Sequence, residues 1–216
     1  MSRQSGARPL DSGDLPEIKL DALREIGNIG AGTAATALAT LTGAPVEMAV
    51  PRVTVLPIER VPELFGGDEA LVAAVFLPVF GDVSGHMLFL MSEEAAHSVA
   101  DAMLGDIDGG EPVLHAFGEM KLSALQEMGN IITSSYLCAI AEMTGLHLEP
   151  GPPALGVDMA GALLAAALAE AAVDTDVALV IETAFTDGES PAAGEFLFIP
   201  EGDSVGLALA RLGIEE

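Results

Sequence analysis

The sequence of 216 residues has one cysteine, Cys138, and only eight basic residues, and each scarcity excludes a class of protein. A single cysteine cannot form an internal disulfide, so we expect a protein of a reducing, cytoplasmic setting. Lysine occurs only at positions 19 and 121, against 33 acidic residues and a formal net charge of −25. Such an acidic surface repels nucleic acid and anionic membranes, and neither is therefore an expected partner. The same excess is typical of halophilic proteins, because high salt screens the self-repulsion.

Uncharged apolar runs and metal-ligand patterns are also lacking. The apolar stretch 159–181 is interrupted by Glu170, Asp174 and Asp176, whereas a membrane-spanning helix needs ~20 mostly uncharged residues. Residues 1–14 are polar, without the ~7–15-residue apolar segment of a signal peptide, and are expected to be a flexible tail. The histidines lack metal-ligand spacing, so no metal site is predicted among His86, His97, His115 and His147.

The chain does contain a duplicated segment. Half of its residues are hydrophobic, which is enough for one substantial core. Residues 19–51 and 121–153 align without a gap at an offset of 102 and agree at 14 of 33 positions. Two copies are too few for a solenoid, so we expect a duplicated domain with a pseudo-two-fold axis. The predicted organisation is a tail at 1–14 and one domain at 15–216, made of repeats 15–110 and 113–216.

Each copy carries the same polar signature: Asp or Ser, three residues, Glu, two residues, Asn, twenty-two residues, Pro. On a helix the first three positions fall within an arc of roughly 60°. The opposite side is apolar and includes Leu41, whereas Leu137 interrupts the polar side of the second copy. Gly27 and Gly30 lie inward, where each costs about 1 kcal/mol of helix propensity but permits close packing. The signature residues are Asp21, Glu25, Asn28 and Pro51 in the first copy and Ser123, Glu127, Asn130 and Pro153 in the second.

The remaining segments predict an α+β fold of duplicated half-domains with pseudo-two-fold symmetry, in which about six strands form a sheet and the paired motif helices lie on one face. A linker around 106–112 separates the halves, and Gly43 and Gly145 are predicted to end the motif helices. The segments GHMLFLM and GEFLFIP occupy equivalent places at an offset of 109. Strands are predicted at 46–56, 70–80, 84–91, 154–158, 176–186 and 193–199, and helices after the first motif helix at 92–104, 116–144, 159–172 and 201–212.

The duplicated signature resembles the CheC/CheX/FliY family of chemotaxis phosphatases, in its two-site form. The motif segments cover 66 of the 216 residues, and the two-half organisation extends the resemblance to nearly the whole chain. The resemblance implies an enzyme of two-component signalling, a hydrolase of the aspartyl phosphate on a CheY-type response regulator. It also implies that the catalytic residues are Glu25 with Asn28 and Glu127 with Asn130.

The resemblance implies a role for each signature position as well. The Asn would orient the attacking water, because a carboxamide accepts and donates hydrogen bonds without titrating. The Glu would pair with a cation of the receiver and fix the docking geometry. The Asp or Ser one turn earlier would support the Glu or contact the partner, and the Pro would fix the chain path. No cofactor of its own is expected, since the family's receiver holds Mg²⁺ in its own acidic pocket.

Two functions stay open at this point. The alternative to catalysis is a non-catalytic adaptor of the chemotaxis or flagellar-switch system that sequesters the receptor deamidase CheD or the phosphorylated receiver. Intact Glu and Asn in both copies favour catalysis. The sites are expected to be unequal, because Arg24 can divert the neighbouring Glu25 carboxylate whereas Gln126 cannot form an ion pair. Cys138, between apolar neighbours, is expected to be a buried structural thiol.

Overall fold

The computed structural model describes residues 17–43, 45–104, 117–171, 177–186, 191–201 and 204–211. The predicted tail and the predicted linker lie outside the described residues. The helices are α1 (Glu17–Thr42), the 3-10 helix η1 (Ile58–Phe65), α2 (Glu93–Leu104), α3 (Glu119–Thr144), α4 (Ala160–Ala171) and α5 (Ser204–Arg211). The strands are β1 (Glu47–Pro57), β2 (Leu71–Gly81), β3 (Gly85–Ser92), β4 (Leu148–Pro150), β5 (Ala154–Met159), β6 (Val177–Thr186) and β7 (Pro191–Pro200).

The strands form one antiparallel sheet in the order β1-β6-β7-β3-β2-β4, with β5 also paired to β2. The two halves are interleaved, because β1 of the first half pairs with β6 of the second, while β4 and β5 of the second half pair with β2 of the first. The described sheet has seven strands where about six were expected. The additional strand is β4, three residues long, whose pairing with Val79–Gly81 joins segments far apart in sequence.

A pseudo-two-fold axis passes through the middle of the sheet, between β3 and β7. Leu88 and Leu197 are equivalent residues of the two halves, and they face each other directly in the antiparallel register. On either side of this pair, Gly85 lies opposite Pro200 and Met91 lies opposite Gly194. The two segments GHMLFLM and GEFLFIP therefore pair with each other, and the predicted α+β fold with duplicated halves is confirmed.

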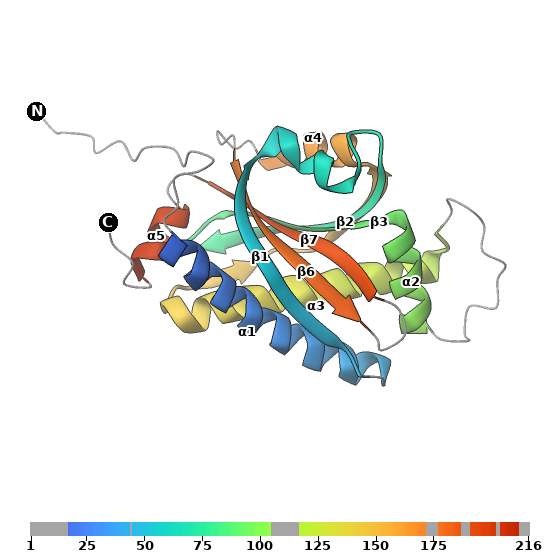
Figure 1. Ribbon diagram of the computed structural model, residues 1–216, viewed down its shortest axis with the longest axis horizontal. Helices are drawn as coiled ribbons and strands as arrows, with labels where there is room; N and C mark the ends of the chain where they lie inside the picture. The colour runs from blue at the N-terminus through green and yellow to red at the C-terminus, as the bar shows by residue number, and fades with distance from the viewer. Residues whose placement is uncertain are drawn as a thin grey trace, which may run out of the picture.

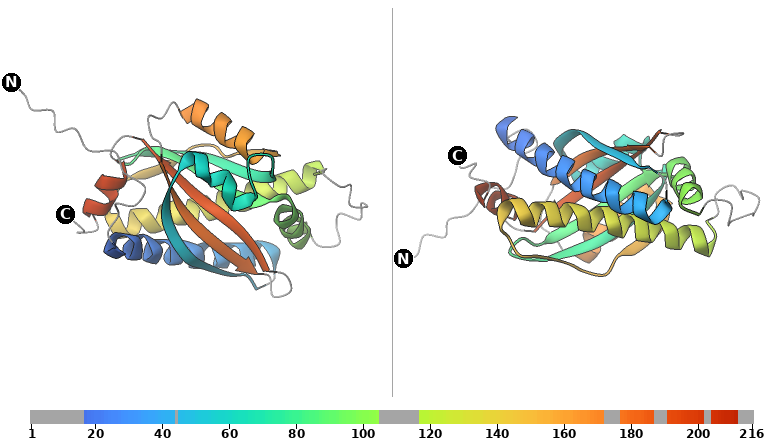
Figure 2. Two further views of the ribbon diagram at one scale, coloured as in Figure 1. Left: turned by 45° about the horizontal axis from the view of Figure 1, so that its top comes forward. Right: turned by 90° about the horizontal axis from the view of Figure 1, so that it is seen from below.

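The sheet separates two layers of helices. The motif helices α1 and α3 lie side by side on one face with α2 beside them, whereas α4 and η1 cover the other face (Figures 1 and 2). Alternation along each strand sends side chains to the two layers in turn. On β7, Phe196 packs under the motif helices and Leu197 packs under α4 and η1. The predicted placement of both motif helices on one face is confirmed.

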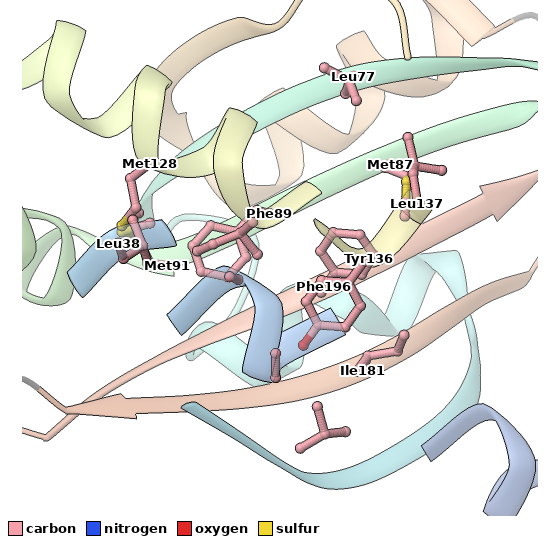
Figure 3. Packing of buried hydrophobic residues seen from close by; sticks show 14 of the residues in the cluster. Leu38, Leu77, Met87, Phe89, Met91, Met128, Tyr136, Leu137, Ile181 and Phe196 are labelled. Atoms are coloured by element: carbon pink, nitrogen blue, oxygen red, sulfur yellow. The ribbon is translucent and has the colours of Figure 1, made fainter. Parts of the chain in front are cut away.

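An aromatic pair lies at the centre of the core beneath the motif helices (Figure 3). Tyr136 of α3 stacks on Phe196 of β7 with ring centroids 4.5 Å apart, and both side chains are fully buried. The Tyr136 hydroxyl lies 3.3 Å from Thr183 Oγ1. Burial raises the pKa of Tyr136 to about 12, and the hydrogen bond with Thr183 acts in the opposite direction. The neutral ring therefore anchors α3 to the sheet.

The helix ends follow local rules that the sequence predicted. Gly43 and Gly145 both have φ of +69°, and their N–H groups donate to the carbonyls four residues earlier. Ser92 Oγ accepts a hydrogen bond of 3.2 Å from the Ala95 N–H and caps α2. In the part of the chain that the structure describes, no helix combines the length and apolarity needed to cross a bilayer.

Candidate active site

The two motif helices run in opposite directions and approach closely where they cross. Gly30 of α1 is buried against Tyr136 of α3, and a Cβ built on Gly30 would lie 3.0 Å from the Tyr136 Cα. A side chain at this position would crowd the Tyr136 backbone, so a glycine suits the crossing despite its helix-propensity cost. The crossing leaves one side of each helix open to solvent, and the signature residues lie on that side.

The first signature is fully displayed, since Asp21, Glu25 and Asn28 are all exposed. Arg24 Nη2 lies 3.1 Å from Asp21 Oδ1. The prediction that Arg24 would divert Glu25 is therefore wrong. Residues three apart on a helix are neighbours, whereas consecutive side chains point in different directions, so Asp21 is the partner that Arg24 can reach.

Asn28 is tied to the strand that follows its helix. The backbone N–H of Val50 donates a hydrogen bond of 3.2 Å to Asn28 Oδ1. Val50 and Pro51 lie in β1 where the register with β6 shifts between Ala49 and Arg52, so the Val50 N–H is turned toward the helix. Because an N–H must meet an oxygen, the Asn28 amide is fixed with Nδ2 away from Val50. The spacing from Asn to Pro in the signature therefore places the Pro next to the residue through which the edge strand β1 contacts the motif helix, at the register shift.

The second signature is held differently. Ser123 and Glu127 are exposed, whereas Asn130 is half-buried. The residue equivalent to Val50 is Pro152, which has no N–H to donate. The helix is joined to the following segment through Gln126 instead, whose Nε2 donates to the Pro153 carbonyl at 3.3 Å. The Asn130 carboxamide oxygen is thus spared the strand contact that occupies Asn28 Oδ1.

Three side chains of the motif helices lie elsewhere than their periodicity predicted. Leu137 is only 4% exposed, because α3 packs on α1 as well as on the sheet and Leu137 lines an apolar cavity that Leu23 of α1 also lines. Cys138, the next residue, consequently faces outward and is exposed, so the predicted buried thiol is wrong. Leu41, in the last turn of α1, is 52% exposed and lies in an open groove beside the first turns of α3.

The chemistry available at each signature is one carboxylate and one carboxamide on a rigid helix. A clearly shifted pKa is found on the opposite face of the sheet from the signatures: burial, and then the charge of Glu182, raises the pKa of Glu195 to about 7. Within the described residues, no group of three His, Cys, Asp or Glu side chains is placed to hold a metal ion. Such sites are suited to orienting a water molecule and a charged partner.

No pattern in the sequence predicts the groove that adjoins the second signature. This groove, of about 500 Å³, lies where the ends of α1 and α2 meet the first turns of α3. The signal that could have indicated the groove is an apolar residue at a helix end, Leu41 in α1 and Met120 in α3, since amphipathic periodicity alone assigns such residues to the core. We call this groove the second-motif groove. It is lined by Leu41, Met103, Leu104, Glu119, Met120, Ser123, Ala124 and Glu127.

Known proteins resemble this chain in sequence and in fold. A model of the CheC-like family matches residues 18–55 and 120–157, which contain the two signatures. The chain is 34% identical over 203 residues to a Bacillus subtilis protein named CheY-P phosphatase CheC, covering 92% of this chain and 96% of that one. It is 29% identical over 139 residues to a Halobacterium salinarum protein named putative CheY-P phosphatase CheC1, covering 63% and 68%.

The solved structure of FliY from Thermotoga maritima shares the fold, with a TM-score of 0.76 at 21% identity over 94% of this chain and 100% of that chain. The middle domain of FliM from Vibrio alginolyticus aligns with a TM-score of 0.63 at 13% identity, over 91% and 99% of the two chains. Since the family model matches both motif segments and a 34% identical relative spans nearly the full length, this chain belongs to the CheC-like family.

Proposed function

We propose that this chain is a protein aspartyl-phosphate phosphatase that dephosphorylates a CheY-type response regulator. The observation that carries the proposal is the pair of Glu/Asn couples on the exposed side of two adjacent helices, Glu25 with Asn28 and Glu127 with Asn130. Similarity over 92% of the chain to a relative named CheY-P phosphatase supports the same activity.

Hydrolysis of an aspartyl phosphate depends on the placement of a water molecule more than on a strong base. The water oxygen forms a bond to phosphorus while the bond from phosphorus to the aspartyl oxygen breaks. The aspartate leaves as a carboxylate, and both water protons go to the inorganic phosphate, which forms as H₂PO₄⁻. Because the transition state is loose, positioning and charge stabilisation supply most of the rate enhancement. A carboxamide held on a helix can do this, and we assign the task to Asn28 and Asn130.

The glutamates are assigned to docking. Glu25 and Glu127 lie one helical turn before the asparagines, so a receiver cation that pairs with either carboxylate brings the phosphoryl group toward the amide. Asp21 and Ser123, a further turn back, would contact the same partner. Pro51 and Pro153 act on the chain path, not on the chemistry. The proposal requires no cofactor in this chain, and Mg²⁺ belongs to the receiver.

The test is the decay of a phosphorylated CheY-type receiver with and without this protein. Asn28→Ala combined with Asn130→Ala should abolish the acceleration while the fold persists, since Asn28 is exposed and Asn130 half-buried, and substitutions outside the core usually change stability by about 0.5 kcal/mol. The lost Val50 hydrogen bond adds about 0.5–1.5 kcal/mol. Glu142→Ala, an exposed change on α3 outside the signature, is the matched control and should act like the wild type. Wild-type protein that leaves the decay unchanged contradicts the function, and an active double variant contradicts the mechanism.

A holding role is the second candidate, and the hydrogen bond from Val50 to Asn28 favours it for the first signature. An amide whose oxygen is engaged still presents its Nδ2 as a donor, which suits binding better than water activation. The partner held there would be the phosphorylated receiver or the receptor deamidase CheD, as in the CheC family. Calorimetry with purified CheD tests whether CheD is the partner. An Asn28→Ala variant that binds CheD like the wild type would show that the first signature is not part of that interface.

The setting proposed for this activity is a salt-rich cytoplasm. The receiver partner and the single cysteine point to the cytoplasm, and the net charge of −25 points to high salt. Near ~0.01 M ionic strength the Debye length is ~30 Å, so self-repulsion reaches across the molecule, against ~3 Å at 1 M. The unfolding midpoint should therefore fall on desalting, and a midpoint independent of salt would contradict a halophilic origin.

A further inference from the structure

The second-motif groove joins the second signature to an apolar surface. Ser123 and Glu127 form part of its lining, so a partner that docks on Glu127 also covers the groove. Its volume of about 500 Å³ lies within the range of roughly 300–1,000 Å³ found for ligand sites. Continuity with the signature therefore makes the groove part of the same contact surface.

The exposed lining is apolar and adaptable. Leu41 and Met120 are 52% and 50% exposed, although both side chains are large and hydrophobic. Adjacent exposed apolar side chains indicate a contact surface, and the flexible thioether of Met120 can adjust to the shape of a partner side chain. Glu119 and Glu127 are exposed beside them and supply negative charge at the rim.

The groove is formed before a partner arrives, because two contacts fix α2 against the start of α3. Lys121 Nζ lies 2.6 Å from Asp101 Oδ1, and the Lys121 side chain is largely buried. The His97 ring stacks on Phe117 with centroids 3.9 Å apart. A preformed surface loses little conformational entropy on binding, which strengthens docking.

We infer that the second-motif groove docks the receiver partner by taking one of its apolar side chains, flanked by a basic residue that meets Glu119 or Glu127. This inference rests on the proposed function for the identity of the partner. A basic flank is required because the rim is acidic. A second copy of this chain is disfavoured as the occupant, since its eight basic residues against 33 acidic ones leave few cations to meet Glu119 or Glu127.

The surface beside the first signature is bordered by a different helix, α5 in place of α2 (Figure 1). Ile18 and Met143 are equivalent to Met120 and Leu41 and are exposed as well. However, α5 carries Ala210 where α2 carries Asp101, so the ion pair that fixes α2 has no equivalent there. Docking through an apolar side chain should therefore distinguish the second signature from the first.

The test compares two double variants. The groove pair combines Leu41→Gln and Met120→Gln in one chain, and the matched pair combines the equivalent changes Met143→Gln and Ile18→Gln. Calorimetry measures the Kd for a purified CheY-type receiver carrying beryllofluoride, a stable mimic of the aspartyl phosphate. Receiver-decay assays give KM and kcat. We expect the groove pair to raise Kd and KM about five- to twentyfold with kcat nearly unchanged, and the matched pair to change them less than about twofold.

Each outcome decides the inference. Equal effects of the two pairs, or a loss in kcat without a change in Kd, would overturn it. A wild-type dimer that the groove pair converts to monomer in sedimentation would make a second copy the occupant and would overturn it too. If either double variant melts early, Met120→Gln and Ile18→Gln alone provide the same comparison. Wild-type protein that binds the receiver without speeding its decay would defeat the proposed function and leave the docking result standing.

Discussion

The two signatures share their residue pattern and differ in what surrounds it. At the first, Asp21 is paired with Arg24, and Asn28 accepts a hydrogen bond from the Val50 N–H. At the second, Ser123 forms no such pair, because Gln126 turns to the Pro153 carbonyl. The second signature also adjoins the groove at the end of α2. A duplicated motif can therefore hold one site with a restrained amide and another with an unrestrained one.

The difference arises from residues outside the signature. Val50 has an N–H to donate, whereas its equivalent, Pro152, has none. An amide oxygen has two lone pairs, and the Val50 N–H uses one of those of Asn28, so Asn28 keeps less capacity than Asn130 to accept from and orient a water molecule. We therefore expect the Glu127 and Asn130 site to be the faster one.

The largest effect should come from the equivalent glycines Gly27 and Gly129. A Cβ on Gly129 would lie 2.5 Å from Val75 Cβ, whereas one on Gly27 would lie 3.2 Å from the Val50 methyl groups. Gly129→Ala must move α3 off the sheet, and overpacking costs about 1–3 kcal/mol against about 1 kcal/mol regained in helix propensity.

Chemical denaturation should thus show Gly129→Ala less stable than Gly27→Ala by about 1–2 kcal/mol. Gly32→Ala, where a Cβ meets nothing within 4 Å, is the control and should stabilise the chain slightly. Equal losses at Gly27 and Gly129 would mean that the two helices are seated alike.

The second effect concerns Pro152→Ala, which restores an N–H at the position equivalent to Val50. A hydrogen bond to Asn130 worth about 0.5–1.5 kcal/mol would slow receiver dephosphorylation about two- to tenfold. The same change in a chain that already carries Asn130→Ala should have no effect. A Pro152→Ala enzyme as fast as the wild type would show that amide restraint does not separate the sites.

The smallest effect concerns the sheet positions related by the offset of 109, which hold His86 in the first half and Glu195 in the second. Glu195 lies directly opposite Glu182, and Arg52 lies 3.7 Å from Glu182, so the proton is held on Glu195. The unfolded chain releases that proton near a pKa of 4.5 and the folded chain near about 7. Between these values the folded state holds more protons, so stability falls as pH rises.

Glu195→Gln should therefore raise the free energy of unfolding by about 0.5–1 kcal/mol near pH 8 and give no gain near pH 4, since the carboxyl is only partly enclosed. Urea titrations at the two pH values measure this, with Glu142→Gln on the exposed side of α3 as the control. A gain of the same size at both pH values would show that packing, not the proton, sets the effect.

Sequence patterns predict the elements of this fold better than their contacts. The periodicity predicts both motif helices and their Gly43 and Gly145 ends, because these depend on local spacing, and the duplication predicts their common face. The β4 strand and the burial of Leu137 depend on partners that lie far away in sequence, β2 and α1.

The site follows the same division. The exposure of Glu25, Asn28 and Glu127 could be expected from the polar arc that they share. The contact of Asn28 with Val50 could not, because it depends on the register shift of β1 against a strand from the other half. The spacing of twenty-two residues from Asn to Pro was the available signal, and only the fold gives it a physical meaning.

The most direct test of the account compares Asn28→Ala with Asn130→Ala as single variants, using the decay of a phosphorylated CheY-type receiver under identical salt. The account predicts that both variants keep part of the activity and that Asn130→Ala loses more, by about threefold or above. A larger loss from Asn28→Ala would contradict the ranking, and complete loss from either change alone would show that the two sites do not act independently.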